Sequence, residues 1–158
     1  MALLRLEADG RTVTPINGEE ASQPVVDLAV WLEDRPEGTG VRLESGQGPE
    51  EWGPGLAQDL GVVPLIVLNF PRYADGRHYS VARKLRGQYG YQGRLRAVGD
   101  VLFDQIALMA RCGFDEFEPA DGTDATRAAE VIGRYRHVYQ ASSDGQTPVW
   151  SHRQEGEQ

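Results

Sequence analysis

The sequence has little cysteine, lysine and histidine, and it has no long apolar run. One cysteine, Cys112, excludes an internal disulfide and a metal or iron–sulfur site built from several cysteines. No stretch approaches the ~18 apolar residues of a membrane-spanning helix, and the first residues lack the apolar region of a signal peptide. The three histidines, His78, His137 and His152, have no metal-ligand spacing. These absences predict a cytoplasmic bacterial protein without a membrane segment or a metal.

The sequence motifs of common cofactor and hydrolase sites are also missing. There is no G-x-G-x-x-G, no G-x-x-x-x-G-K-[ST], no G-x-S-x-G and no C-x-x-C. We therefore expect no nucleotide, flavin, metal or haem cofactor. Any redox role would use an electron carrier held by another protein.

Length and charge suggest one acidic domain with a locally basic segment. The 158 residues predict a single domain over 1–140 and a polar tail over 141–158. A net charge of −8 argues against nucleic acid as a general partner. Between Arg72 and Arg96, however, seven basic residues face one acid, Asp75. This segment is either a patch that binds an anion or an acidic partner, or a solvated helix face.

Apolar runs and turn residues alternate in a way that predicts strands followed by helices. Asp9-Gly10 lies between two β-prone runs and predicts a hairpin of residues 3–6 and 11–14. Pro24 precedes an apolar run and predicts a helix over 25–32. We further expect strands at 40–44, 65–70, 95–98 and 114–118, and helices at 49–60, 80–89, 101–111 and from Thr123 or Asp124 to about Arg136.

About four successive strand–helix units predict an α/β fold with a mainly parallel sheet. Only the strand 65–70 is apolar throughout, as burial on both faces requires. The other strands alternate and place charged residues on one face: Arg42 with Glu44, Arg94 with Arg96, and Glu116 with Glu118. We therefore expect a curved sheet, like half of a TIM barrel, with helices outside and charged residues inside. A homodimer would cover that charged face.

The loop that leads into the helix 80–89 is the strongest candidate for a binding site. In parallel sheets, sites lie where strands end and loops enter helices. Arg72 and Arg77 offer guanidinium donors, and the helix start offers free N–H groups. Either these groups form an oxyanion or carboxylate pocket, or Asp75-Gly76 is a turn with solvated arginines. His78 has the pKa for acid–base work, although a loop histidine is more often a surface residue.

The helix 101–111 has polar residues at its start and a cysteine just after it. Asp100 either caps this helix, which we favour, or supplies a carboxylate at the mouth of the sheet. Asp104 and Gln105 interrupt apolar runs, so we expect Asp104 to have a partner such as an arginine. Cys112 has no nearby base that could activate it, so we expect a buried, inert thiol.

Three segments together closely resemble one bacterial family. They are D-G-R-H-Y-S-V-A-R-K-L-R over 75–86, G-Y-Q-G-R-L-R-A-V-G-D-V-L-F-D-Q over 90–105, and R-C-G-F-D-E-F-E over 111–118. The family is called "domain of unknown function 934", and the resemblance covers roughly residues 62–140, and more loosely 24–61. At His78 the sequence departs from the small residue that we expect in this family.

The resemblance implies a role in sulfite reduction, because genes of this family tend to lie beside those for sulfite reductase and sulfate assimilation. The family carries an oxidoreductase label, but no catalytic assignment comes with it. By their position in the motif, the residues to watch are Asp75, Arg77, Tyr79, Ser80, Arg83, Arg96, Asp100, Asp104 and Gln105. Without Arg83, and with Arg72 from the loop before the motif, they form our candidate set for binding an anion or a partner.

Two functions therefore stay open. The first is an adaptor for assimilatory sulfite reduction, without a cofactor of its own, whose basic patch docks sulfite reductase or an acidic electron-transfer protein such as a ferredoxin. The second is a small enzyme that acts on an oxyanion or a phosphorylated small molecule. In the enzyme, Arg77 and Arg96 would bind the substrate, and an aspartate or tyrosine would serve as acid or base.

Overall fold

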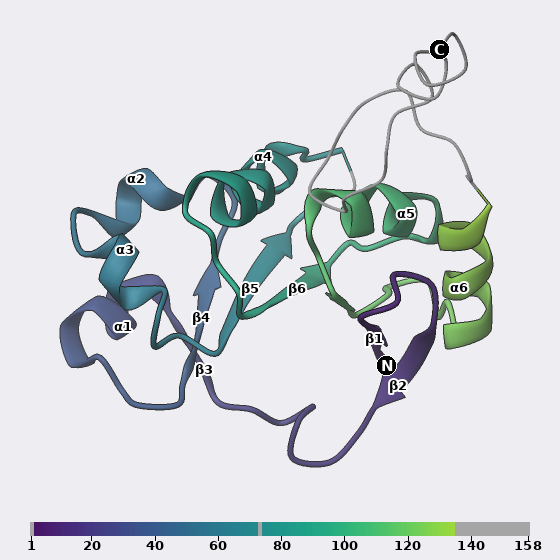
Figure 1. Ribbon diagram of the computed structural model, residues 1–158, viewed down its shortest axis with the longest axis horizontal. Coiled ribbons are helices and arrows are strands. Elements are labelled where there is room, and N and C mark those ends of the chain that lie inside the picture. Colours follow the sequence, from purple (N-terminus) through teal and green to yellow (C-terminus); the bar gives the residue numbers. More distant parts are fainter. Residues whose placement is uncertain (1, 73, 135–158) are drawn as a thin grey trace, which may run out of the picture.

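The computed structural model describes residues 2–72 and 74–134, and all of its strands join one seven-stranded sheet (Figure 1). The strand order is β2-β1-β7-β6-β5-β4-β3. Strands β3 to β7 run parallel to one another, and β1 pairs antiparallel with both β2 and β7. The strands are β1 (Leu3–Leu6), β2 (Val13–Ile16), β3 (Val25–Asp27), β4 (Gly40–Leu43), β5 (Leu65–Phe70), β6 (Arg94–Gly99) and β7 (Glu116–Phe117). The mixed α/β fold, the mainly parallel sheet and the N-terminal hairpin are thereby confirmed.

The helices follow the parallel strands. They are α1 (Leu28–Asp34), α2 (Pro49–Trp52), α3 (Leu56–Asp59), α4 (Arg77–Arg83), the π-helical continuation η1 (Lys84–Gln88), α5 (Phe103–Cys112) and α6 (Ala125–Gly133). The expected helix 49–60 is two short helices, because Gly53 has a φ of 92°, which is not helical, and so ends the first of them. The expected end of the last helix at about Arg136, like the tail 141–158, lies outside the described residues.

Residues 25–32 are not one helix, as we expected, but a strand followed by a helix. Val25 and Val26 are β-branched, which favours an extended backbone, and they pair with Gly40 and Val41 of β4. Asp27 is still extended, with ψ at 154°, and the helix α1 begins only at Leu28. The sheet therefore has five parallel strands, each followed by at least one helix, rather than four.

Two other helix starts differ from the expected ones. α4 begins at Arg77, three residues before the expected Ser80. α5 begins at Phe103, so Asp100 is not its cap, and the carboxylate of Asp121 instead accepts a hydrogen bond from the Phe103 N–H at 2.9 Å. For α6 the expected cap is confirmed, because Asp124 accepts from the Arg127 N–H at 2.9 Å.

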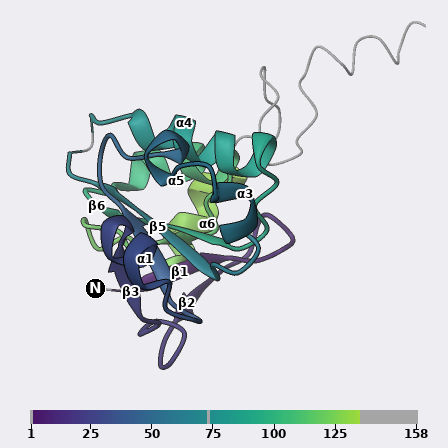
Figure 2. The same ribbon diagram turned by 90° about the vertical axis from the view of Figure 1, so that its left-hand side faces the viewer.

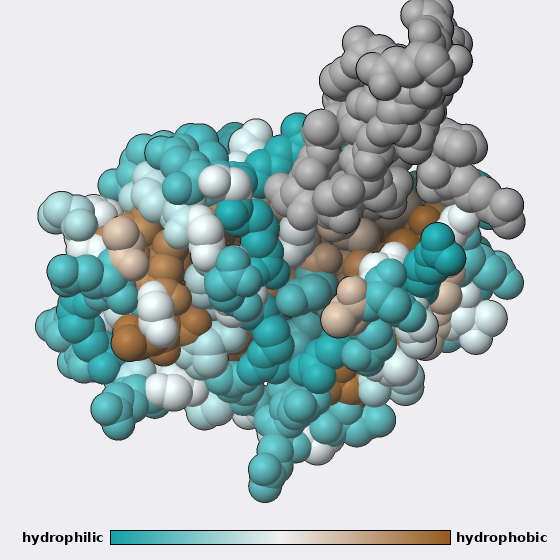
Figure 3. All heavy atoms as spheres, viewed as in Figure 1, coloured by the Kyte–Doolittle hydropathy of each residue, from teal (hydrophilic) through white to brown (hydrophobic). Residues whose placement is uncertain are grey.

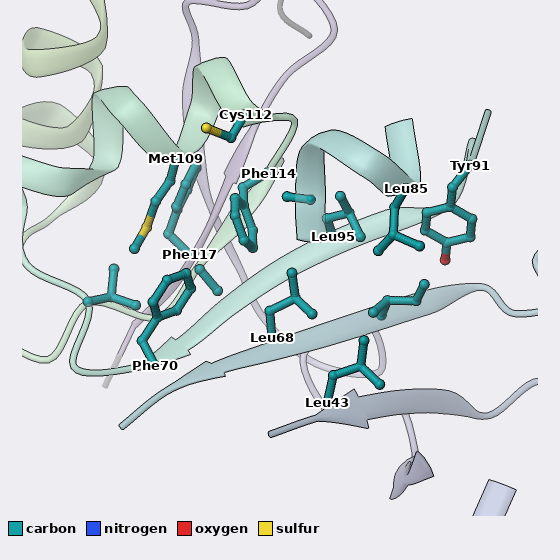
Figure 4. Packing of buried hydrophobic residues seen from close by; sticks show 14 of the residues in the cluster. Leu43, Leu68, Phe70, Leu85, Tyr91, Leu95, Met109, Cys112, Phe114 and Phe117 are labelled. Carbon is teal, nitrogen blue, oxygen red and sulfur yellow. The ribbon is translucent and has the colours of Figure 1, made fainter. Parts of the chain in front are cut away.

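The main core lies between the sheet and the helices. α4 and α5 lie on the same side of the sheet (Figure 2). Buried side chains of β4 to β7 join those of η1 and α5 in one apolar cluster, which includes Leu43, Leu68, Phe70, Leu85, Leu95, Met109, Cys112, Phe114 and Phe117 (Figure 4). Cys112 is fully buried there, as expected. Burial at ~25 cal/mol per Å² of apolar surface makes this cluster the main source of stability.

The other face of the sheet is the charged one that the strand alternation predicts. Arg94 and Arg96 of β6 and Glu116 of β7 point to this side, together with Arg5 of β1. It also carries a small apolar cluster of Leu65, Val67 and Val98, against which Val25 packs. We call this side the inner face.

The segment that joins β2 to β3 covers the inner face. These two strands form opposite edges of the sheet, so residues 17–24, which we call the crossover, pass from one edge to the other. Measured across its strands, a flat seven-stranded sheet is about 29 Å wide. The nine Cα–Cα steps from Ile16 to Val25 would barely cover this width even in a fully extended chain. The crossover contains turns over 18–22 and is not extended. The sheet is therefore curved, with its two edges drawn toward each other and the charged face inside.

Gly40 permits part of this curvature. A Cβ at this position would lie 3.0 Å from the carbonyl oxygen and 3.2 Å from the Cβ of Leu65. Without a side chain at Gly40, Val25 of the edge strand reaches the Leu65 cluster two strands away. Because the crossover covers the charged residues, the reason for expecting a homodimer there disappears.

Candidate functional site

A group of polar side chains meets where β4 and β5 end, as the rule for parallel sheets predicts. The Glu44 carboxylate accepts from Asn69 Nδ2 and from Arg42 Nε, both at 2.6 Å. Ser45 Oγ donates to the carboxylate of Asp75 in the loop after β5. These hydrogen bonds outweigh the effect of burial on Glu44, so its pKa lies below the ordinary value. The Ser45 hydrogen bond lowers the pKa of Asp75, and both groups are carboxylates at neutral pH.

Gly99 at the end of the next strand allows this arrangement. Its φ is 91°, and a Cβ there would lie 2.3 Å from the Phe70 carbonyl oxygen and 2.6 Å from Asn69 Oδ1. The N–H of Asp100 donates to the same Phe70 oxygen at 2.7 Å. The three strand ends are thus in direct contact, and Asn69 lies between Glu44 and Gly99.

His78 lies directly beneath this edge. It is 1% exposed, its ring packs edge-on against Phe70 at 5.5 Å, and neither ring nitrogen has a hydrogen-bond partner among the described residues. The carbonyls of Leu43 and Asn69 face the ring without reaching hydrogen-bond geometry. Burial lowers the pKa of His78, and the charges of Asp75 and Glu44 oppose this effect only in part. The imidazole is therefore neutral at pH 7, and it is not the surface residue that a loop histidine suggests.

The arginines of the same loop lie outside. The Arg77 side chain is 70% exposed, and its Nε lies 3.6 Å from Asp75 Oδ1. Arg72 and Arg83 are exposed and form no ion pair or side-chain hydrogen bond within residues 2–72 and 74–134. Lys84 pairs with Glu50 at 2.8 Å, with both side chains largely in solvent. We call Arg72, Arg77, Arg83 and Lys84 the basic ridge.

The basic segment 72–96 does not form one surface. Arg86 donates to the carbonyls of Gly113, Tyr91 and Gly93 at 2.7–3.0 Å and has a structural role. Arg94 and Arg96 belong to the inner face. Four of the seven basic residues therefore form the ridge, and the structure does not place Arg77 and Arg96 in one site.

Other residues of the candidate set are scattered around this edge. Tyr79 packs on Phe70 at 5.4 Å, and burial raises its pKa to about 12, which does not suit acid–base work at neutral pH. Ser80 is exposed on α4, and Gln105 is half-buried on α5. Asp104 is exposed and has no side-chain hydrogen bond or ion pair among the described residues, so the partner that we expected is absent there; α5 buries only its other side, with Ile106, Met109 and Cys112.

The inner face holds a second cluster, built around Glu116. Arg5, Arg94 and Arg96 donate to its carboxylate at 2.9, 3.2 and 2.8 Å, and Glu116 is fully buried. Burial alone would raise the pKa of Glu116, but the hydrogen bonds from Arg96 and Arg5 and the arginine charges hold it below the ordinary value. We call these four residues the inner cluster.

The crossover supplies further partners to the inner cluster. Arg5 Nη1 binds Glu20 Oε2 at 2.9 Å, Arg96 Nη2 donates to the Glu20 carbonyl at 3.3 Å, and Arg94 donates to the side chain of Gln23. Between the crossover and the sheet lies a hollow of about 380 Å³, lined by Arg5, Glu19, Glu20, Gln23, Pro24 and Arg94. This hollow lies at the side of the β6 start, away from the carboxyl ends of the strands.

A comparison with known protein families identifies the family to which the motifs quoted above belong. The model of a family described as "Bacterial protein of unknown function (DUF934)" matches residues 40–150, more than two thirds of the chain. The chain belongs to the DUF934 family. Neither the curated proteins nor the solved structures contain a match to it.

The DUF934 match begins at the first residue of β4. It therefore includes the edge residues, the basic ridge, and three members of the inner cluster, Arg94, Arg96 and Glu116. Arg5 and the crossover precede it. The alternation along β6 and β7 already indicated the charged face. No local pattern at Arg5 or Glu20 predicts that these two residues lie on that face, because their place depends on how distant strands pair.

Within the described part of this DUF934 chain, no helix is long and apolar enough to cross a membrane. No group of three or more histidine, cysteine, aspartate or glutamate side chains is arranged there to hold a metal ion.

Proposed function

We propose that this DUF934 protein is an accessory protein of sulfite reduction that docks an acidic protein partner on its basic ridge. The observation that carries the proposal is the ridge itself: the Arg77 side chain is 70% exposed, and Arg72 and Arg83 form no ion pair within the described residues. Guanidinium groups left in solvent by their own chain are available to carboxylates of a partner. Sulfite reductase or an acidic electron-transfer protein is the partner that the family resemblance suggests.

The surroundings of the ridge favour a protein partner. Residues over α4 in Figure 3 are mainly hydrophilic, as at a surface that binds and releases its partner. The whole chain carries a charge of −8, so a local positive surface orients an acidic partner during encounter. Such contacts steer association and weaken with salt.

A genetic and a binding experiment together test the proposal. Deletion of the gene should impair growth on sulfate but not on cysteine. A variant with Arg77→Glu and Arg83→Glu should fail to restore growth, and it should bind the cell's own sulfite reductase or ferredoxin on the order of 10-fold more weakly at low salt. Arg11→Glu with Arg127→Glu is the control, because it changes the charge equally at exposed sites away from the ridge. Equal growth of the deletion strain on both sulfur sources would remove the sulfur assignment.

His78 favours a second candidate function, an enzyme that acts on a small oxyanion or phosphorylated molecule beside the same loop. A neutral, buried imidazole without hydrogen-bond partners beneath Asp75 and Arg77 is unusual for a purely structural residue. Arg77 would bind the oxyanion, and His78 would accept or donate the proton.

Single substitutions distinguish the two functions. In the enzyme, Arg77→Ala should weaken binding of sulfite or phosphate roughly 10- to 100-fold, while Arg83→Ala changes nothing. In the adaptor, both substitutions should weaken partner binding, and the loss should fade as salt rises. Calorimetry with these anions and with the purified partner measures both.

A further inference from the structure

The inner cluster carries more positive charge than its buried carboxylate balances. Three guanidinium groups surround Glu116, and one negative charge against three leaves an excess of two. The side chains of Arg96 and Glu116 are 7% and 0% exposed, and those of Arg5 and Arg94 are 24% and 27% exposed, so solvent screens this excess only in part. Arg5 in addition has a buried Nε without an acceptor among the described residues. The cluster therefore needs further negative charge close by.

In the structure the crossover supplies that charge. Glu20 binds Arg5 at 2.9 Å although its side chain is 60% exposed, and Glu19 beside it lines the same hollow. An exposed carboxylate on a turn gains little from such a pair, because water competes with it. Glu19 and Glu20 thus supply the two negative charges that the cluster needs, and a bound anion could take their place.

The hollow offers room for a ligand that would take over this role. Its volume of about 380 Å³ lies within the range of small-molecule sites, and Arg5 and Arg94 form part of its wall. Gln23 adds a side-chain amide and already accepts a hydrogen bond from Arg94. Two guanidinium groups on one wall match the oxygens of a carboxylate or of a tetrahedral oxyanion.

We propose that this hollow is a binding site for a small dianion, which replaces the Glu20 carboxylate on Arg5 and contacts Arg94. Dicarboxylates and inorganic oxyanions share the required chemistry, two negative charges on oxygen atoms within a few ångströms. The site lies on the sheet face opposite the helices, so it is independent of the basic ridge and of the function proposed for it. Glu20 acts as an internal competitor of the ligand.

Titration calorimetry with malonate, succinate, sulfite, sulfate and phosphate tests the site in the full chain. We expect saturable binding of a dianion, tighter by roughly 3- to 10-fold in Glu20→Gln, because the competing carboxylate is gone. Arg94→Gln should weaken the same binding at least 10-fold. Whichever group of ligands binds more tightly, the dicarboxylates or the inorganic oxyanions, identifies the class of ligand.

Two controls keep the result specific. Arg11→Gln, at the exposed hairpin turn and outside both proposed sites, should leave dianion binding unchanged, which shows that the loss in Arg94→Gln is not a general effect of removing one positive charge. Circular dichroism verifies that Arg94→Gln is folded. Glu20→Gln changes only an exposed side chain, so we expect it to fold like the wild type. Absence of dianion binding in both wild type and Glu20→Gln, or binding that neither inner-face substitution alters, would overturn the proposal.

Discussion

At the scale of single residues, His78 shows how burial sets the charge of a side chain. It is enclosed by Phe70 and the ends of β4 and β5, so protonation would place a cation in a poorly solvated site. Its pKa in the folded protein lies below the ordinary value of 6.5. The unfolded chain therefore binds this proton more readily than the folded chain, and acid favours unfolding.

The pH dependence of stability should reveal this histidine. The free energy of unfolding of the wild type should fall as pH drops below about 6.5, by at most ~1.4 kcal/mol per pH unit from this group. His78→Leu removes the group, so its stability should fall less steeply between pH 7 and pH 5. Urea unfolding at several pH values measures both slopes, which should coincide above pH 8. Identical slopes throughout would show that His78 titrates normally.

Glu116 presents the opposite case, a buried carboxylate kept ionised by arginines. Its lowered pKa means that its stabilisation is complete above the ordinary value of 4.5 and is lost as pH falls through the folded value. Glu116→Gln leaves Arg5, Arg94 and Arg96 close together without their shared anion. We expect a loss of about 3–5 kcal/mol at pH 7, measured by urea unfolding. The exposed Glu130→Gln is the control and should change stability by less than ~0.5 kcal/mol.

At the scale of elements, Gly99 fixes how β6 ends beside β5. A methyl group there would collide with the Phe70 carbonyl oxygen at 2.3 Å, and the φ of 91° is strained for any other residue. Gly99→Ala should therefore destabilise the protein by more than ~2 kcal/mol. Thermal unfolding followed by circular dichroism measures the change.

Gly87 provides the matched control for this prediction. It lies in η1, where an added Cβ meets nothing within 4 Å and φ is in the ordinary range. Gly87→Ala should be neutral or stabilise by up to ~1 kcal/mol, because alanine loses less backbone entropy in a helix. If both variants melted alike, the close approach at Gly99 would be irrelevant to stability.

Local patterns predicted most elements because each depends on nearby residues. The hairpin around Asp9-Gly10, the apolar strand 65–70 and the Asp124 cap are examples. Errors occurred where tertiary contacts decide. The pairing of Val25 with Gly40 makes a strand of an apolar run that resembles a buried helix, and Asp121, far along the chain, caps α5 in place of Asp100.

At the scale of the whole molecule, the candidate sites were predictable only in part. The rule that sites follow parallel strands led to Asp75, Arg77 and His78, and alternation led to the charged face. The partners Arg5, Glu20 and Gln23 come from the first 24 residues, and no local signal shows that β1 inserts beside β7 or that the crossover spans the inner face. The count of positive charge over 72–96 does not by itself show that the sheet divides these residues between two sides; only the alternation along 94–98 indicated that Arg94 and Arg96 lie on the inner face.

The first 39 residues form both edges of the sheet, on either side of the strands that match the family. They provide β2 and β1 at one edge of the sheet, β3 at the other edge, and the crossover between them. Their side chains Leu4, Val13, Leu28 and Trp31 belong to the main core. Without them, β4 and β7 would become open edges, and the inner cluster would lose Arg5.

We therefore predict that residues 40–158 alone do not fold cooperatively, although they contain the whole family match. Purified alone, this fragment should aggregate or show a broad thermal transition, and a synthetic peptide of residues 1–39 should restore a sharp one. Insertion of two residues between Asp9 and Gly10, at the exposed hairpin tip, is the control and should shift the melting temperature little, because the loop is in solvent. Circular dichroism and size-exclusion chromatography measure both. A fragment 40–158 that is monomeric and melts within a few degrees of the full chain would show that the N-terminal segment is an accessory to the sheet and not part of its core.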